Sequence, residues 1–441
     1  MRRDPHEAEK VLDMASAKTE AAEVWCVDSE RIPVRFEDNK MKMLELSSST
    51  GMALRVIAGG RIGFAASTKA GAGTELVDKA LATAEFGTEA DFAFAELGQY
   101  PAMEIHDPAV VALTAESMTQ TGGEILEKIL AYDPEIKANV SLDRGVAQVR
   151  LLSSRGLDLS RQGTHASILC WTTLVEGESL LRTGDMVGSR YLYKDPVEIA
   201  DRTVEQIAIG RKAASIASGK YPVVFSPWAL GDILRPVLAC VDGDAVSRGV
   251  SPWRERRGEC LADDRLSIYD DGLMPGGLGT APWDDEGVAS QCTPIIEDGV
   301  LKSFLLDLRN SGRLDLPPTG NGQRGGLTSV PGVGTTNIRV EPGDTPYREM
   351  LASIDEGILV HQLMGAWGSN PYGGQVSGNI ALGFKIEKGE LVGRVKDCML
   401  YLNAFEAWRD QLSAISSEVR QVLSYSYPHV LIDGVSVSAG D

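Results

Sequence analysis

The chain has 441 residues and a formal net charge of −19 at pH 7. The length predicts two or three domains with a sizeable core, whereas the acidic balance argues against direct contact with nucleic acid, which requires a basic face. No run of about 18 apolar residues occurs, so the sequence predicts no helix that spans a membrane.

The N-terminus and the cysteines indicate the cellular compartment. The first twenty residues start basic but lack the apolar stretch of a signal peptide. The six cysteines are scattered and form no CxxC pair, so neither a zinc ribbon nor a dithiol motif is expected. We therefore expect a cytoplasmic protein with reduced thiols and no bound cofactor.

The first ninety residues predict a helix, an antiparallel meander and a second helix. A helix is expected over 6–19. The clearest hairpin spans 51–67, where two apolar runs flank the pair Gly59–Gly60, which can supply the positive φ angles of a tight turn. Thr74 is a candidate N-cap for a helix that ends at Glu85.

The next segment repeats this pattern after a linker. Residues 88–112 carry few periodic signals, and a helix is expected near 114–131. Strands follow at "KANVSLDRG", "AQVRLLSSRG" and "HASILCWTTLVEG". A long helix is expected over about 195–217, and Gly219 is the residue that ends it.

The C-terminal half predicts one buried strand and helix, then many short strands. The strand lies at 221–227, and Ser226–Pro227 signals a helix that runs to about Val241. Asp298–Gly299 and Lys388–Gly389 are expected hairpin turns. Two later helices are expected at "YREMLASI" and "NAFEAWRDQLSAI". The turn-rich stretch 311–336 is long enough to suggest a functional or mobile loop.

These elements predict an α+β protein with two domains, antiparallel sheets and packed helices. The expected N-terminal α+β domain covers 1–219, in two sub-segments of about 1–90 and 113–219. The expected C-terminal domain, 220–441, is rich in short strands.

A search for self-contained catalytic motifs finds none. No two histidines are three or four residues apart, so no helix presents two of them on one face. The sequence has no HExxH, no G-x-S-x-G elbow and no P-loop lysine. The histidines are at positions 6, 106, 165, 361 and 429.

The stretch 357–384, "GILVHQLMGAWGSNPYGGQVSGNIALGF", combines polar and aromatic residues with seven glycines. His361 is either satisfied within a strand or an interface, or is a polar contact in a groove that receives an extended peptide by edge-strand pairing. Trp367 and Tyr372 either anchor a partner or belong to the core. We take His361, Trp367, Asn370 and Tyr372 as candidate contacts for a peptide or partner.

Several segments, in order along nearly the whole chain, resemble one family. They are "GMALRVIAGGRIGFAAS", "FSPWALGDILRPVLACVDGDAVSRGVS", "GECLADDRLSIYDDG", "PTGNGQRGG", "TNIRVEPGD", the stretch from "GILVHQL" to "VGRVKD", and "YLNAFEAW". This series resembles the TldD/PmbA family, whose members have long been labelled modulators of DNA gyrase.

The resemblance implies where a zinc site would lie. One subunit type of the family is a zinc metalloprotease with HExxxH on the first helix of its C-terminal domain, in which the glutamate activates the bound water. Both ligand positions are apolar here, and the general-base position is arginine. The matching residues are Leu234, Arg235, Pro236, Val237, Leu238 and Ala239.

The sequence is therefore similar to the PmbA (TldE-like) branch, which lacks the zinc site. This implies a non-zinc subunit, without metal or catalytic residues of its own, that assists proteolysis or peptide maturation by a TldD-like protease. The expected partners are that protease or a second copy of this chain, and a peptide or unfolded substrate. The alternatives are a free-standing peptidase or amide hydrolase with a site assembled from distant residues, and a non-proteolytic protein-binding modulator, for example of DNA gyrase.

Overall fold

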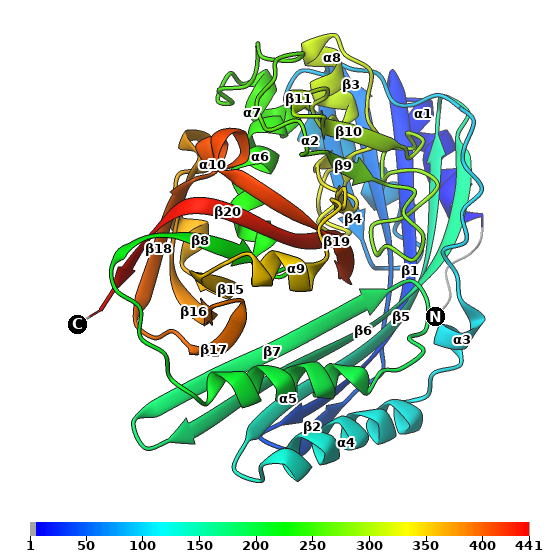
Figure 1. Cartoon of the computed structure of the whole chain (residues 1–441). Helices are drawn as coiled ribbons and strands as arrows, with labels where there is room; N and C mark the ends of the chain where they lie inside the picture. The colour runs from blue at the N-terminus through cyan, green and yellow to red at the C-terminus, as the bar shows by residue number, and fades with distance from the viewer. Residues whose placement is uncertain (1–5, 441) are drawn as a thin grey trace.

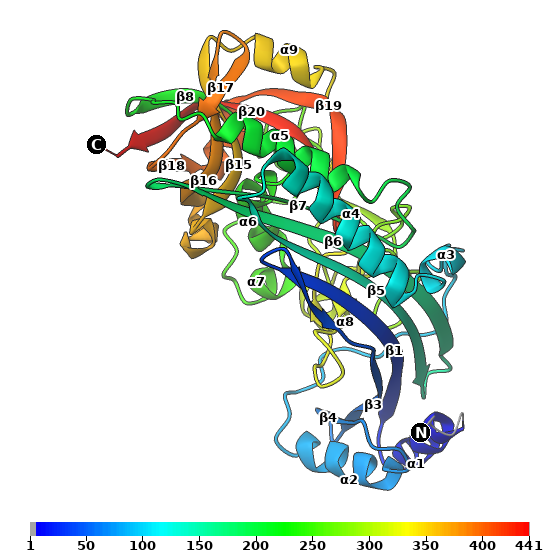
Figure 2. The same cartoon turned by 90° about the horizontal axis from the view of Figure 1, so that it is seen from below.

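The computed structural model consists mainly of two mostly antiparallel β-sheets with packed helices (Figures 1 and 2). It describes residues 6–440, except for the side chain of Leu44. The predicted α+β class is confirmed. The described helices are α1 (Glu7–Ser16), α2 (Gly73–Ala84), α3 (Pro108–Val111), α4 (Ala115–Tyr132), α5 (Glu198–Gly210), α6 (Leu230–Val241), α7 (Gly243–Ser247), α8 (Leu308–Leu314), α9 (Tyr347–Ala352) and α10 (Ala404–Asp410).

The first sheet has seven strands among the described residues, in the order β4-β3-β1-β5-β6-β7, with β2 beside β1. Three of them are long and curve together across the molecule (Figure 2). The strands are β1 (Ala21–Glu37), β2 (Lys40–Leu44), β3 (Ser47–Ala58), β4 (Arg61–Ser67), β5 (Lys137–Ser153), β6 (Asp158–Glu176) and β7 (Ser179–Ser189).

One face of this sheet is covered by helices at both ends. α1 and α2 pack on apolar residues of β1 and β3 such as Val24 and Leu54, whereas α4 and α5 pack on the far part of the sheet, around Val34 and Leu142. α4 starts with a capping box, in which Thr114 and Ser117 each accept from the other's backbone N–H.

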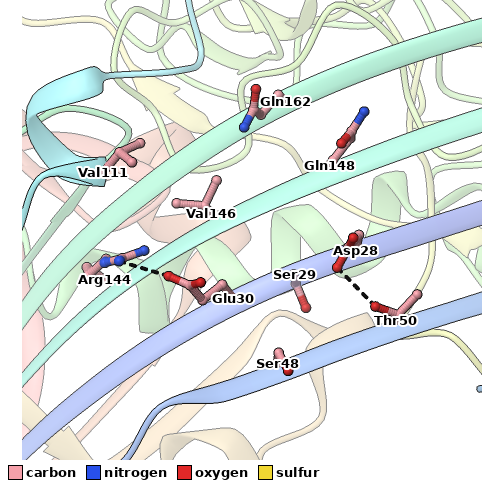
Figure 3. A pocket seen from close by; sticks show the side chains of 10 residues that line it. All are labelled: Asp28, Ser29, Glu30, Ser48, Thr50, Val111, Arg144, Val146, Gln148 and Gln162. Atoms are coloured by element: carbon pink, nitrogen blue, oxygen red, sulfur yellow. Dashed lines mark hydrogen bonds and ion pairs between the residues drawn. The ribbon is translucent and has the colours of Figure 1, made fainter. Parts of the chain in front are cut away.

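Between the two helix pairs, the same sheet carries polar side chains. They line an open trough of about 470 Å³ (Figure 3). Glu30 pairs with Arg144 at 2.8 Å, and Thr50 donates to Asp28 at 3.0 Å. Among the described helices, the short α3 reaches the edge of the trough through Val111. The polar residues explain why none of the longer described helices packs over the trough, because an apolar helix face would leave them without partners.

The second sheet has eleven strands among the described residues, five of which close into a ring, β8-β15-β16-β18-β20. The ring closes because β20 pairs with both β18 and β8, which removes the exposed edges of these strands. The strands are β8 (Gly219–Phe225), β9 (Ile268–Asp271), β10 (Cys292–Glu297), β11 (Val300–Leu301), β14 (Ile338–Val340), β15 (Glu356–Met364), β16 (Gln375–Glu387), β17 (Glu390–Arg394), β18 (Cys398–Asn403), β19 (Leu412–Val422) and β20 (Tyr425–Ala439); β12 (Gly322–Gln323) and β13 (Gly332–Val333) form a separate pair.

Both faces of the ring are apolar. Val223 and Phe225 of β8 share a core with Ile233 and other residues of α6. Val224, which points to the opposite face, belongs to the core that also contains α4, α5 and the first sheet. The ring is therefore packed between α6 and the helices of the N-terminal half.

The three predicted hairpin turns are confirmed. Gly59–Gly60 joins β3 to β4, with φ angles of 58° and 68°. Asp298–Gly299 and Lys388–Gly389 join β10 to β11 and β16 to β17, and all four of these residues also have positive φ. Two-residue turns of this kind match the twist of the strands that they connect.

Two predicted helix starts are wrong. α2 begins at Gly73 and its N-cap is Ala72, so Thr74 lies inside the helix and its hydroxyl contacts the sulfur of Met14. α6 begins at Leu230, after a turn in which the Ser226 hydroxyl accepts from the N–H of Ala229 at 3.3 Å.

Two predicted helix ends are also wrong. α5 ends at Gly210, because Ala213 bridges to Arg394 in the C-terminal half, and Gly219 starts β8 instead of ending a helix. α10 ends at Asp410, and the rest of its predicted range belongs to β19, which pairs with β20. In both segments tertiary pairing overrides local helical preference.

Within the described part of the chain, none of the helices combines the length and the apolar character required to cross a bilayer.

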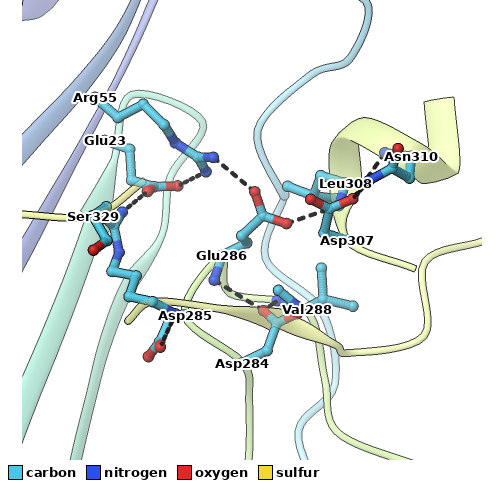
Figure 4. A network of polar contacts seen from close by, with 12 residues as sticks. Glu23, Arg55, Asp284, Asp285, Glu286, Val288, Asp307, Leu308, Asn310 and Ser329 are labelled. Carbon is cyan, nitrogen blue, oxygen red and sulfur yellow. Dashed lines mark hydrogen bonds and ion pairs between the residues drawn. The ribbon is translucent and has the colours of Figure 1, made fainter. Parts of the chain in front are cut away.

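A buried ion network joins the first sheet to the C-terminal half (Figure 4). Arg55 of β3 donates to Glu23 of β1 at 3.0 Å and to Glu286 at 2.7 Å, and Arg324 donates to the other oxygen of Glu23 at 3.0 Å. All four side chains are at most 3 % exposed. Glu286 also accepts from the backbone N–H of Leu308, the first residue of α8. The network therefore holds the loop around Glu286 and the start of α8 against the first sheet.

We predict that Arg55→Met lowers the free energy of unfolding by about 3–5 kcal/mol, because it leaves Glu23 and Glu286 buried without their shared cation. Denaturant unfolding measures the change. Arg409→Met is the matched control, because Arg409 forms an exposed ion pair with the adjacent Asp410, and it should leave the unfolding free energy nearly unchanged. Equal effects of the two variants would contradict the importance of the network.

Candidate functional site

α6 carries Leu234–Ala239, the six residues that the sequence resemblance matches to a zinc motif. Leu234 is fully buried in the core beside Val237, and Pro236 lies inside the helix. None of the three side chains at the ligand and base positions, Leu234, Arg235 and Ala239, has an atom that binds zinc in proteins. Within residues 6–440, no group of three or more His, Cys, Asp or Glu side chains could hold a metal ion. The residues present therefore do not fit the zinc that the family's motif would hold.

Arg235 instead fixes a loop against α6. Its Nη2 donates to the carbonyl oxygens of Ala366 at 2.8 Å and Ser369 at 3.2 Å. The loop contains two short 3₁₀ turns, η1 (Ala366–Gly368) and η2 (Pro371–Gly373). Gly365 and Gly374 at its ends have φ angles of 87° and 71°, which favour glycine. The residue at the position of the general base thus acts as a hydrogen-bond donor to backbone.

His361 belongs to β15, and its buried ring contacts Gln206 of α5. Oε1 of Gln206 accepts from the backbone N–H of Gly184, which leaves the amide nitrogen of Gln206 to donate to Nε2 of His361, 3.1 Å away. The imidazole also lies beside the Trp228 ring, with 6.0 Å between centroids. Burial lowers the pKa of His361 to about 4, so the ring is neutral at pH 7.

The other three candidate contacts lie on the loop that Arg235 holds. Trp367 is 79 % exposed and Asn370 is exposed, whereas Tyr372 is half-buried and packs against the main core of the C-terminal half. The structure therefore brings Trp367, Asn370 and Tyr372 onto one loop and separates them from the buried His361. A contact of these four residues with a peptide or a partner stays a prediction.

A cavity of about 480 Å³ opens beside α6, on the side of Arg235. Its walls combine residues from β7, α6, β15, β19 and β20 with the segment before α6. Burial raises the pKa of Asp232 to about 6, although the nearby Arg235 acts in the opposite direction. The walls include Met186, Trp228, Asp232, Arg235, Tyr425 and Tyr427.

Sequence reasoning singled out Arg235 through the motif position, but it missed the other residues of this cavity. Trp228, Asp232 and Arg235 lie within eight positions of one another, but Met186 and Tyr427 are far away in sequence. The one available signal was the spacing of Asp232 and Arg235, which places both on one side of a helix.

The comparisons with known proteins establish the family of the chain. Three family models match: PmbA/TldA metallopeptidase domain 1 at 22–84, the central domain at 114–219 and the C-terminal domain at 218–439. The chain belongs to the PmbA/TldD family.

The relatives within the family carry different descriptions. An uncharacterized protein of Methanocaldococcus jannaschii is 26% identical over 416 residues, which cover 93% of this chain and 95% of that protein. A metalloprotease of the same organism is 30% identical over 238 residues, which cover 52% of this chain and only 50% of the metalloprotease. The structure of TldE from Thermococcus kodakarensis is similar, with a TM-score of 0.92 at 22% sequence identity. The match covers 98% of this chain and 100% of the TldE chain. This likeness establishes the shared fold.

We predict that Asp232→Asn stabilises the protein. Because the pKa of the folded carboxyl is about 6 and that of an unfolded aspartate is about 3.9, ionisation disfavours the folded state increasingly as the pH rises from about 4 to 6. Removing the charge should therefore raise the unfolding free energy by about 2–3 kcal/mol at pH 7.5 and by about half of that at pH 5.

Denaturant unfolding at the two pH values measures this gain. Asp244→Asn is the control, because Asp244 is 49% exposed on its side chain and pairs with Arg248, and it should produce no gain at either pH. A loss of stability in Asp232→Asn at pH 7.5 would show that the carboxylate has a stabilising partner in the folded chain.

Proposed function

We propose that this chain is the subunit without zinc chemistry of its own in a TldD/PmbA-type peptidase complex, where it assists proteolysis or peptide maturation by a TldD-like metalloprotease. The observation that carries the proposal is the composition of α6. At the motif positions, Leu234 is core, and Arg235 is bonded to the loop through two backbone carbonyls. A water-activating centre requires ligands and a base at these positions.

Two histidines, the buried His361 and the half-buried His429, give further support. Burial lowers the pKa of His429 to about 4, as it does for His361. His429 is also stacked on Tyr347, with 4.0 Å between ring centroids. A general base works best when its pKa is near the operating pH, so neither imidazole is suited to acid–base catalysis at neutral pH. A subunit of this kind acts through contact with a partner.

The surface proposed for that contact is an exposed apolar patch on the ring. Met364 of β15 pairs with Asn379 of β16, which pairs with Met399 of β18, so the three side chains lie in one row on one face. Tyr401 lies on the same face two residues further along β18, and Trp367 follows Met364 on the loop. Met364, Trp367, Met399 and Tyr401 are between 49% and 79% exposed. We call these four residues the Trp367 patch.

We predict that Trp367→Ala weakens assembly with the protease partner, or with a second copy of the chain, by roughly 30-fold, since a central aromatic anchor contributes about 2 kcal/mol. The melting temperature should stay close to that of the wild type, because the side chain is exposed. Analytical ultracentrifugation and a thermal melt on the same sample measure both. Phe86→Ala is the control, because Phe86 is 88% exposed after α2 and lies outside the patch. Unchanged assembly of Trp367→Ala would remove the patch from the interface.

We also predict that the purified chain holds no stoichiometric zinc and cleaves no peptide alone, because the motif positions on α6 supply no ligand. Elemental analysis after dialysis and a peptide digest read by mass spectrometry test this. About one zinc per chain would contradict it, because a protein zinc site normally has three or four protein ligands. Co-expression with an HExxxH-bearing member of the family should then yield a complex with peptidase activity.

A further inference from the structure

The cavity beside α6 has the size and composition of a small-molecule site. Its volume of about 480 Å³ falls within the range of ligand pockets, which are mostly apolar with a few placed polar groups. Trp228, Tyr425 and Tyr427 supply aromatic walls, and Met186 and Leu363 supply aliphatic ones. The proposed interface does not use this cavity, because none of the residues of the Trp367 patch lines it.

The walls are held in place by other residues. Trp228 meets Trp171 of β6 edge-on, with 5.4 Å between centroids. Tyr425 and Tyr427 are stacked with 5.2 Å between centroids. The hydroxyl of Tyr427 is buried and has no hydrogen-bond partner within residues 6–440. The walls are thus positioned before a ligand binds, which reduces the conformational entropy that the side chains lose on binding.

The charge in the cavity comes from two side chains of α6, Asp232 and Arg235. Arg235 is already engaged with the carbonyl groups of the loop. The carboxylate of Asp232, by contrast, has no hydrogen bond or ion pair within four ångströms among the described residues, and the side chain is half-buried in the cavity wall. A carboxylate beside aromatic side chains can bind a ligand that has a cationic group and an apolar part. The carboxylate pairs with the cation, and the aromatic rings contact the apolar part.

We propose that this cavity binds a primary ammonium group attached to an apolar body, with Asp232 as the ion-pair partner and Trp228, Tyr425 and Tyr427 around the body. In a peptide, this chemistry occurs at the N-terminal residue and on a lysine side chain. The choice of a peptide as ligand rests on the proposed function. Binding itself requires only this chain, so it succeeds or fails independently of any partner protease.

The test is isothermal titration of the full chain at pH 7.5 with the dipeptide amide Phe-Ala-NH₂ and its N-acetylated form. The free amine should bind at least about tenfold more tightly, because acetylation removes the cation that would form an ion pair with Asp232. Asp232→Asn should abolish this preference and Asp232→Glu should retain it. Asp244→Asn, on the exposed pair with Arg248, should behave as the wild type.

A third probe, N-acetyl-Lys-Ala-NH₂, distinguishes the two sources of the ammonium group. If it binds and Phe-Ala-NH₂ does not, the cavity takes a lysine side chain, and the assignment of Asp232 stands. Equal affinity for the free and acetylated dipeptides, no binding of any of the three probes, or a preference that survives in a folded Asp232→Asn variant would each overturn the proposal.

Discussion

The position of one half of the molecule against the other depends on four buried charges. Glu23 and Arg55 belong to adjacent strands of the first sheet, and Glu286 and Arg324 come from loops of the C-terminal half (Figure 4). Glu286 and Arg324 find their partners, Arg55 and Glu23, across the contact between the halves, so the desolvation cost of these two charges is offset by those pairs only when both halves are in contact. The network thus favours one arrangement of the two sheets over others.

The arrangement of the two sheets determines which residues surround α6. The cavity beside the helix takes one wall from β7 of the first sheet and the others from the C-terminal half, so it exists only while the sheets keep their relative position. On the same helix, Arg235 holds the loop that carries Trp367. In the proposed function, the helix that would carry zinc in a protease subunit instead organises a binding cavity and a partner surface.

Local chemistry explains why some of this was predictable. The turns at Gly59–Gly60, Asp298–Gly299 and Lys388–Gly389 depend on positive φ angles that a few residue types adopt readily, and a short sequence window contains that information. The ends of α5 and α10 depend on pairing with distant segments, at Arg394 and β20, and no local window contains those partners. β7 was not predicted at all, because its glycines and polar residues weaken the strand pattern.

The candidate site was likewise predictable only where one continuous segment contains the information. The resemblance identified α6 and its missing zinc ligands from one continuous segment. The burial of His361 against Gln206, the exposure of Trp367 and the cavity around Asp232 all arise from contacts between segments far apart in sequence. An aromatic residue among glycines is compatible with either a core or a surface, and only the fold separates the two.

In the proposed function, catalysis belongs to the partner and not to this chain. The peptidase activity of this chain, reconstituted with an HExxxH-bearing family member whose motif glutamate has been replaced by glutamine, tests this directly. This mixture should be inactive, whereas the mixture with the unaltered partner should cleave peptides. Peptide cleavage by this chain in the presence of the inactivated partner would contradict the proposed function.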